Sequence, residues 1–289
     1  MKQIIFDGNF MAHRARHTTG RLRNGISFGM LKSMNTVCKR FESNNIVWVF
    51  DGGISPSRRE MMPEYKTGRG TVDGLFSTQV KHANKAIEAL GGKILRYTGV
   101  EADDIIAIIA KSSEEESIIV SSDKDFLQLI DDNISVFNPI KNELTTKQNM
   151  EEWLDGEPVS RYLEVKSMTG DPSDSIPGIR GIGLKTAIKS LKHFEDFDSL
   201  PSNDLSGRLS ILNENECIEI LHRNYALMRL PTTADQVDID NPKHLGTYIQ
   251  ERMDSCSRCF DDFEAWVTKS GMKSIQKKID EWKKIYGGA

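Results

Sequence analysis

The sequence has no long apolar run and only four cysteines. No stretch approaches the length of a membrane span, and the N-terminal MKQIIFDGNF lacks the apolar core and cleavage site of a signal peptide. We therefore expect a cytoplasmic protein without a membrane partner. Cys256 and Cys259 form a CxxC pair, but no second pair or regularly spaced histidines accompany it. This absence disfavours a zinc site, so reduced thiols are expected.

The bulk composition fits a soluble globular protein. Its 289 residues are enough for one large or two modest domains with a sizeable core, and they are 38% hydrophobic and 28% charged. The formal net charge of −4 does not by itself indicate a nucleic-acid partner.

Three short apolar segments end in aspartate. QIIFDG ends at Asp7, IVWVFDG at Asp51, and SIIVSSDKD at Asp123 and Asp125. Runs rich in β-branched residues are typical of buried parallel strands. Further strand and helix patterns cover residues 92–99 (strand), and 26–42, 75–90 and 103–112 (helices). The alternation predicts an α/β fold, a mostly parallel twisted sheet flanked by helices, which binds ligands at the carboxyl ends of its strands.

Helical patterns dominate after about residue 145. They cover residues 157–168, 184–193, 214–228, 245–268 and 271–285. We expect an α/β core over 1–150 and a helical C-terminal part over 151–289, packed together without a flexible linker.

Acidic side chains gather at the predicted sheet edge and in one later loop, TGDPSDSIPG. They are Asp7, Asp51, Glu101, Asp103, Asp104, Asp123, Asp125, Asp171 and Asp174. Any one of them is more simply explained as a helix cap or a solvated loop residue. Together they would repel each other unless cations lay among them, and oxygen ligands select Mg²⁺ or Mn²⁺. Two such ions about 3.5–4 Å apart can activate water and stabilise the leaving oxygen of a phosphodiester.

The triplet in GVEADD reaches this edge from the start of a helix. Glu101 and Asp104 are expected on one helix side, and Asp103 about 100° away from Asp104. Asp104 is the least secure of the three as a direct ligand. Two rival motifs fail: residues 123–133 lack the ligands and glycine of an EF-hand, and FDGN has Asn9 where aspartyl phosphotransferases need a second Asp.

Six motifs in order resemble the 5′-nuclease superfamily, which includes flap endonucleases and the 5′-to-3′ exonuclease domain of bacterial DNA polymerase I. They are IIFDGN, WVFDG, PEYKTGR, GVEADD, SSDKDFLQL and GDPSDSIPGIRGIGLKTA. The size, and SSDKDFLQL followed by VFNPIKNELT, are most similar to stand-alone bacteriophage ribonuclease H or 5′ exonuclease, which would place the protein in the host cell cytoplasm. The resemblance is densest over residues 4–190, and the last hundred residues match loosely.

The resemblance implies a PIN-like core and two Mg²⁺ sites, with Mn²⁺ as a substitute. Asp7, Asp51, Glu101 and Asp103 would form the first site, some of them through water, with Asp104 as an optional member. Asp125, Asp171 and Asp174 would form the second, with Asp123 between the two. Ser175 replaces an asparagine common in relatives and is not an expected ligand.

The segment SPSRREMMPEYKTGRG carries basic residues around an aromatic ring. Arg58, Arg59 and Tyr65 suit a single strand, by phosphate contact and base stacking, although composition alone favours a solvated loop. The resemblance implies a helical arch over 55–85, with Lys66 and Arg69 as a catalytic basic pair that stabilises charge on the scissile phosphate.

A second motif, GIRGIGLKTA, has the turn of a helix-hairpin-helix within residues 171–190. Gly181 and Gly183 would let backbone N–H groups approach a duplex phosphate, and Lys185 and Lys189 add positive charge. The resemblance implies K⁺ on the carbonyl groups here. Near the N-terminus, Arg14 and Arg16 fit a duplex contact and an exposed helix face equally well.

These patterns predict a Mg²⁺-dependent, structure-specific 5′ nuclease. It would act in DNA replication as a flap endonuclease and exonuclease on 5′ flaps, and as a ribonuclease H on RNA primers in RNA–DNA hybrids, leaving a 5′-phosphate and a 3′-hydroxyl. Setting aside the nine acids leaves a charge of +5, as phosphate binding requires. By family analogy a monomer is expected, with a single-strand DNA-binding protein or replisome component as partner. A PIN-class ribonuclease and a non-catalytic junction-binding protein remain alternatives.

Overall fold

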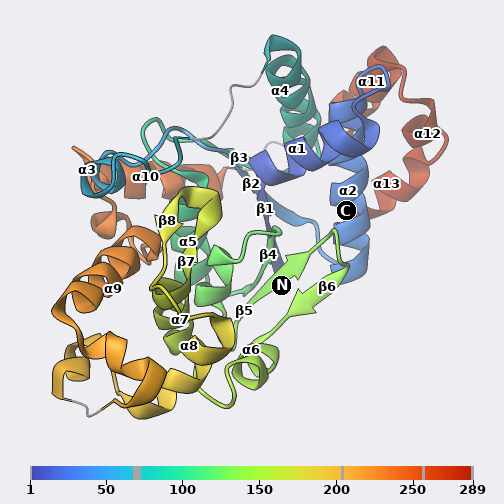
Figure 1. Ribbon diagram of the computed structural model, residues 1–289. Helices are drawn as coiled ribbons and strands as arrows, with labels where there is room; N and C mark the ends of the chain where they lie inside the picture. The colour runs from blue at the N-terminus through green and yellow to red at the C-terminus, as the bar shows by residue number, and fades with distance from the viewer. Residues whose placement is uncertain (1, 68–72, 203–204, 256–257, 288–289) are drawn as a thin grey trace.

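A six-stranded sheet forms the centre of the molecule, and helices cover both of its faces (Figure 1). The computed structural model describes residues 2–67, 73–202, 205–255 and 258–287. The strand order is β3-β2-β1-β4-β5-β6, and all neighbouring pairs are parallel except β5 with β6. The strands are β1 (Lys2–Asp7), β2 (Asn45–Val49), β3 (Lys93–Leu95), β4 (Glu116–Val120), β5 (Ile134–Asn138) and β6 (Glu143–Thr145). The expected mostly parallel α/β fold is confirmed.

Alternate residues of each central strand face opposite sides of the sheet. Ile5, Val47 and Ile119 belong to one apolar core, while Ile4 and Trp48 belong to the other. Because both sides are buried, these strands are apolar throughout instead of alternating with polar residues. The sequence therefore identifies them as central strands of a covered sheet.

One face of the sheet carries the first helices of the chain together with the last. Its helices are α1 (Gly8–Thr19), α2 (Gly25–Phe41), α4 (Gly74–Ala89), α11 (Phe260–Ser270), α12 (Lys273–Gln276) and α13 (Ile279–Tyr286). α11 packs against α4, and Figure 1 shows α11 to α13 beside α2. The pattern over 245–268 predicts one helix, and this is wrong: α10 ends at Asp254, Ser255 takes an extended backbone, and α11 starts at Phe260.

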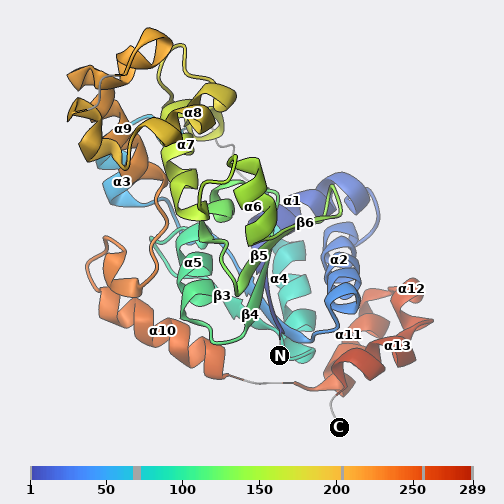
Figure 2. The ribbon, with the colours of Figure 1, turned by 90° about the horizontal axis from the view of Figure 1, so that it is seen from below.

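The opposite face carries α5 and the helical lobe that follows the sheet (Figure 2). Its helices are α5 (Ala102–Ser112), α6 (Lys147–Trp153), α7 (Tyr162–Thr169), α8 (Leu184–Ser190), α9 (Asn215–Met228) and α10 (Pro242–Asp254). Short 3₁₀ helices connect them: η1 (Asp125–Leu129), η2 (Val159–Arg161), η3 (Pro172–Asp174), η4 (Leu191–His193), η5 (Phe197–Ser202), η6 (Gly207–Asn213) and η7 (Ala234–Gln236). The two-residue strands β7 (Gly170–Asp171) and β8 (Ile176–Pro177) pair across the acidic loop. The expected helical C-terminal part is present.

The segment expected to form an arch contributes the short helix α3 (Pro56–Met61) and the first half of α4. None of the helices in the described ranges is long and apolar enough to cross a membrane.

Candidate active site

Three strands deliver aspartates to the carboxyl edge of the sheet. Asp7 ends β1 and caps α1 by accepting a hydrogen bond from Phe10 N at 3.0 Å. Asp51 follows β2 and accepts from Ala102 N at 2.9 Å, which fixes it to the start of α5. Asp123 follows β4. Because β1 pairs in parallel with both β2 and β4, the three carboxylates meet at one edge.

The acids at this edge are buried and crowded. Burial raises the pKa of Asp7 to about 7, and the charges of Asp51 and Asp123 add to the rise. Burial also raises the pKa of Asp103, again helped by these neighbours and opposed by Lys66. Asp103 thus faces the same space as the strand-end aspartates, as expected for a shared site.

Glu101 and Asp104 turn to a different partner. Both accept hydrogen bonds from Arg58, and Asp104 does so through both of its oxygens, at 2.7 and 3.1 Å. The expectation that these two acids share a helix side is confirmed. Burial alone would raise the pKa of Glu101, but Lys66 and Arg58 outweigh it and the pKa is lowered. For Asp104 burial prevails over Arg58, and its pKa is raised.

A second acidic group joins η1 to the loop after α7. The ammonium group of Lys166 on α7 lies 2.5 Å from Asp125 Oδ1 and 2.5 Å from Asp171 Oδ2. Burial raises the pKa of Asp125 to about 6, and Asp123 adds to the rise while Lys166 opposes it. Sequence reasoning missed Lys166. Its only signal is its place in a helix that leads directly into the acidic loop.

Lys66 lies between the two acidic groups. Its Nζ is 3.1 Å from Glu101 Oε1, 3.7 Å from Asp103 Oδ2 and 3.7 Å from Asp174 Oδ2. The side chain is buried, and the backbone has a φ of +54°, which is uncommon for a residue other than glycine. Tyr65 OH donates to Glu101 at 3.3 Å. The sequence-predicted Lys66 is therefore among the carboxylates themselves.

The donor chemistry of this edge suits divalent cations. All nine predicted acids lie in the described residues, and their oxygens are the ligands that Mg²⁺ and Mn²⁺ prefer. Across residues 2–67, 73–202, 205–255 and 258–287, no three Asp, Glu, His or Cys side chains converge tightly enough to form a ready metal cage. The cationic groups of Lys66, Lys166 and Arg58 lie among the acids and hold them apart. The raised pKa values of Asp7 and Asp125 nevertheless mark carboxylates that a cation would stabilise.

The predicted DNA-binding residues fall into two sets. Arg58 and Tyr65 are buried, at 7% and 3% exposure, and their polar groups contact the acids. Burial does not suit base stacking by Tyr65 or phosphate contact by Arg58, although no observation tests these roles directly. Arg59 is exposed beside them. The predicted catalytic Arg69 lies outside the described residues.

Arg14 and Arg16 occupy α1, the helix that follows Asp7. Arg14 is half-buried and donates to Ser33 Oγ at 2.9 Å. Arg16 is exposed, with its guanidinium 3.0 Å from a carboxylate oxygen of Asp73. Both arginines therefore have protein partners, and their contact with DNA stays a prediction.

The predicted hairpin has the expected local geometry. Gly181 has a φ of +88°, and Gly183 directly precedes α8. A Cβ atom at either position would meet no atom within 4 Å, so both glycines border open space. Lys185 and Lys189 are exposed. The turn is thus accessible to a ligand of the size of a duplex.

Comparison with protein families places two matches end to end. Residues 2–155 match the model described as "5'-3' exonuclease, N-terminal resolvase-like domain", and residues 157–244 match "5'-3' exonuclease, C-terminal SAM fold". A 5'-3' exonuclease of Buchnera aphidicola subsp. Schizaphis graminum is 35% identical over 210 residues, which are 69% of this chain and 73% of that protein. A thermostable DNA polymerase I of Thermus filiformis is 31% identical over 79% of this chain and 28% of its own length.

Solved structures share the fold. The 5'-exonuclease of bacteriophage T5 with bound zinc superimposes with a TM-score of 0.72 at 24% identity, over 88% of this chain and all of that one. A T5 flap endonuclease in a pseudo-enzyme-product complex with DNA and metal ions gives a TM-score of 0.69 at 24% identity, with the same coverage.

Proposed function

The chain belongs to the 5′-3′ exonuclease family of phosphodiester hydrolases, and on that premise we propose that it is a Mg²⁺-dependent, structure-specific 5′ nuclease. Its substrates in this proposal are 5′ flaps and RNA primers in RNA–DNA hybrids, near junctions of single strand and duplex. The observation that carries the proposal is the convergence of carboxylates from β1, β2, β4, α5 and the loop after α7 on one sheet edge, with Lys66 among them.

Two Mg²⁺ ions, with Mn²⁺ as a substitute, would be held by the nine acids. In this proposal Asp7, Asp51, Glu101 and Asp103 serve one ion, and Asp125, Asp171 and Asp174 serve the other. Asp104 contributes indirectly, and Asp123 lies between the two sets. When bound, such ions supply an activated water and stabilise charge on the leaving oxygen. No Ser, Cys or His nucleophile is then required.

The chain's own residues orient the substrate. We assign Lys66 the role of stabilising charge on the scissile phosphate, because its ammonium group lies among the acids expected to bind the ions. Arg69 would assist it. The turn at Gly181 and Gly183, with Lys185 and Lys189, would hold the duplex by its phosphates, with K⁺ bound to carbonyl groups of the same turn.

The wider setting is also part of the proposal. A T5 flap endonuclease is described in a complex with DNA and metal ions, and this supports DNA as the partner. We propose action as a monomer in the cytoplasm during replication, with a single-strand DNA-binding protein or a replisome component as partner. The likeness in fold to T5 enzymes supports a phage-type enzyme, ribonuclease H activity and the host cytoplasm, while the relatives named above are bacterial.

A substrate panel tests this function. The protein is mixed with a labelled 5′-flap duplex, a 5′-recessed RNA–DNA hybrid, a hairpin RNA and a free single-stranded RNA, each with Mg²⁺ or EDTA. We expect Mg²⁺-dependent cleavage of the flap and the hybrid near the junction, with 5′-phosphate products. Preference for free single-stranded RNA, or cleavage that persists in EDTA, would contradict the proposal.

A further inference from the structure

Two adjacent arginines on α3 have opposite surroundings. Arg58 is 7% exposed and points toward α5, whereas Arg59 is exposed to solvent. Successive residues of a helix point about 100° apart, so two neighbours in sequence can have unrelated roles. The burial of Arg58 indicates a role inside the protein.

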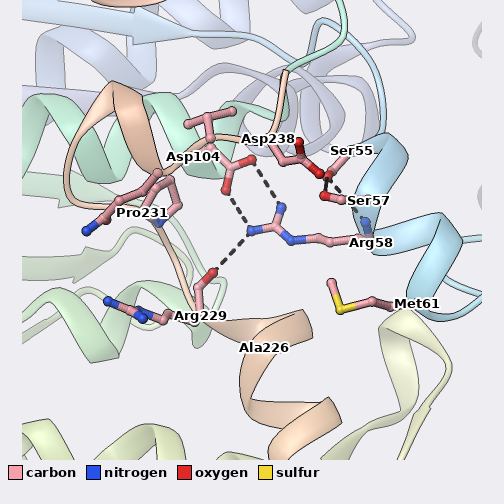
Figure 3. Close-up of a pocket in the computed structure, with 11 residues that line it drawn as sticks. Ser55, Ser57, Arg58, Met61, Asp104, Ala226, Arg229, Pro231 and Asp238 are labelled. Atoms are coloured by element: carbon pink, nitrogen blue, oxygen red, sulfur yellow. Dashed lines mark hydrogen bonds and ion pairs between the residues drawn. The ribbon is translucent and has the colours of Figure 1, made fainter. Parts of the chain in front are cut away.

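The guanidinium group of Arg58 joins three parts of the chain (Figure 3). Nη1 donates to Glu101 Oε2 and, at 3.1 Å, to Asp104 Oδ2. Nη2 donates to Asp104 Oδ1 at 2.7 Å and to the main-chain carbonyl oxygen of Arg229 at 3.2 Å. Arg229 is the residue at which α9 ends. Arg58 therefore connects α3 with the start of α5 and the end of α9.

These bonds use the side of the guanidinium that a phosphate would need. Arginine recognises phosphate through the same planar, two-pronged geometry that here engages Asp104. Both terminal nitrogens already donate twice to protein oxygens. A phosphate contact would have to break a buried ion pair, which is strongly unfavourable because it leaves a buried charge without a partner.

Glu101 is the acid that this arrangement orients. It accepts hydrogen bonds from Arg58, Tyr65 and Lys66, three residues of the same segment, and is 2% exposed. We infer that Arg58 is a positioning residue that orients Glu101 and Asp104 for metal binding, and is not a DNA contact. This inference rests on the proposed function for the identity of the ion, but it concerns the placement of the carboxylates themselves.

A cavity beside Arg58 offers a chemical test of the inference. It has a volume of about 440 Å³, and Ser55, Ser57, Gln236 and Asp238 line it together with Arg58 and Asp104. Truncation of Arg58 to alanine would extend this cavity up to the carboxylates. A free guanidinium ion could then enter and restore the missing donors.

The experiment compares Arg58→Ala and Arg58→Lys with the matched variant Arg59→Ala. Mn²⁺ binding is measured by electron paramagnetic resonance, DNA affinity with a 5′-flap duplex in Ca²⁺, and single-turnover cleavage in Mg²⁺. We expect Arg58→Ala to weaken Mn²⁺ binding and slow cleavage by about 10- to 100-fold, the range typical for partners of metal ligands. Its DNA affinity should stay within about twofold, and millimolar guanidinium chloride should restore part of the Mn²⁺ binding. Arg59→Ala should show the reverse pattern, with weaker DNA binding and unchanged Mn²⁺ affinity.

Arg58→Lys keeps the charge but loses the two-pronged geometry, so it should fold and show an intermediate loss of Mn²⁺ affinity. If both Arg58 variants bind Mn²⁺ like the wild type, or lose DNA affinity instead, the inference is overturned. Since Mn²⁺ binding is read without cleavage, failure of the inference is distinguishable from failure of the proposed function, which would appear as a wild-type protein that cleaves none of the 5′ substrates.

Discussion

The buried carboxylate of Asp7 should make the metal-free protein less stable as the pH rises. Its pKa is raised from 3.8 to about 7, because burial disfavours the charged form. The folded chain therefore holds this proton more tightly than the unfolded chain does. The stabilisation is fully present below about pH 4 and is lost as the pH rises through about 7.

The magnitude follows from the two pKa values. Between about pH 5.5 and pH 8, one group with these values lowers the free energy of unfolding by about 2 kcal/mol. Asp125, with a pKa of about 6, changes stability in the same direction by a smaller amount. Bound Mg²⁺ should offset the loss at about pH 8, because it stabilises the charged carboxylates.

Urea unfolding in EDTA at both pH values, for the wild type and Asp7→Asn, measures this effect. The asparagine is similar in shape and can still accept the hydrogen bond from Phe10 N. The pH-dependent loss should be about 2 kcal/mol smaller in Asp7→Asn than in the wild type. Equal losses in the two proteins, or a wild type that becomes more stable at the higher pH, would refute the reasoning.

Three further substitutions have distinct expected results. Lys166→Met leaves two acids without their ammonium partner, so unfolding in EDTA should be easier by about 3 kcal/mol, and Mg²⁺ should recover part of this loss; an unchanged urea midpoint would count against the ion pair. Lys66→Ala should slow single-turnover cleavage by about 100-fold or more while flap binding in Ca²⁺ changes little, and a pure loss of binding would contradict its role at the scissile phosphate. Lys185→Ala combined with Lys189→Ala should reduce the salt dependence of duplex binding by about one unit of log–log slope for each phosphate that the protein no longer binds; an unchanged slope would show that these lysines do not contact DNA.

The sequence predicts the sheet edge well because its signals are local. Apolar runs that end in aspartate identify strands and place Asp7, Asp51 and Asp123 together, since parallel strands end at one edge. The helix period also predicts that Glu101 and Asp104 share a side. The hairpin of β5 and β6 has a weaker local pattern and is not among the predicted strands.

The cations among the acids could not be predicted in the same way. Lys166 meets Asp125 only because α7 packs against η1, a contact that no local pattern reports. Arg58 and Arg59 look alike in sequence, and only tertiary packing decides that the first is buried. The break between α10 and α11 likewise follows apolar spacing that would allow one continuous helix.

The most direct test of the central claim is single-turnover cleavage of a labelled 5′-flap duplex by the wild type and by Asp174→Asn, with flap affinity measured in parallel in Ca²⁺. Asp174 lies at the second acidic group, 3.7 Å from the ammonium group of Lys66. If the carboxylates form a metal-dependent nuclease centre, the wild type cleaves only with Mg²⁺, whereas Asp174→Asn binds the flap normally and does not cleave it. Cleavage by Asp174→Asn at the wild-type rate, or cleavage by either protein in EDTA, would contradict the account.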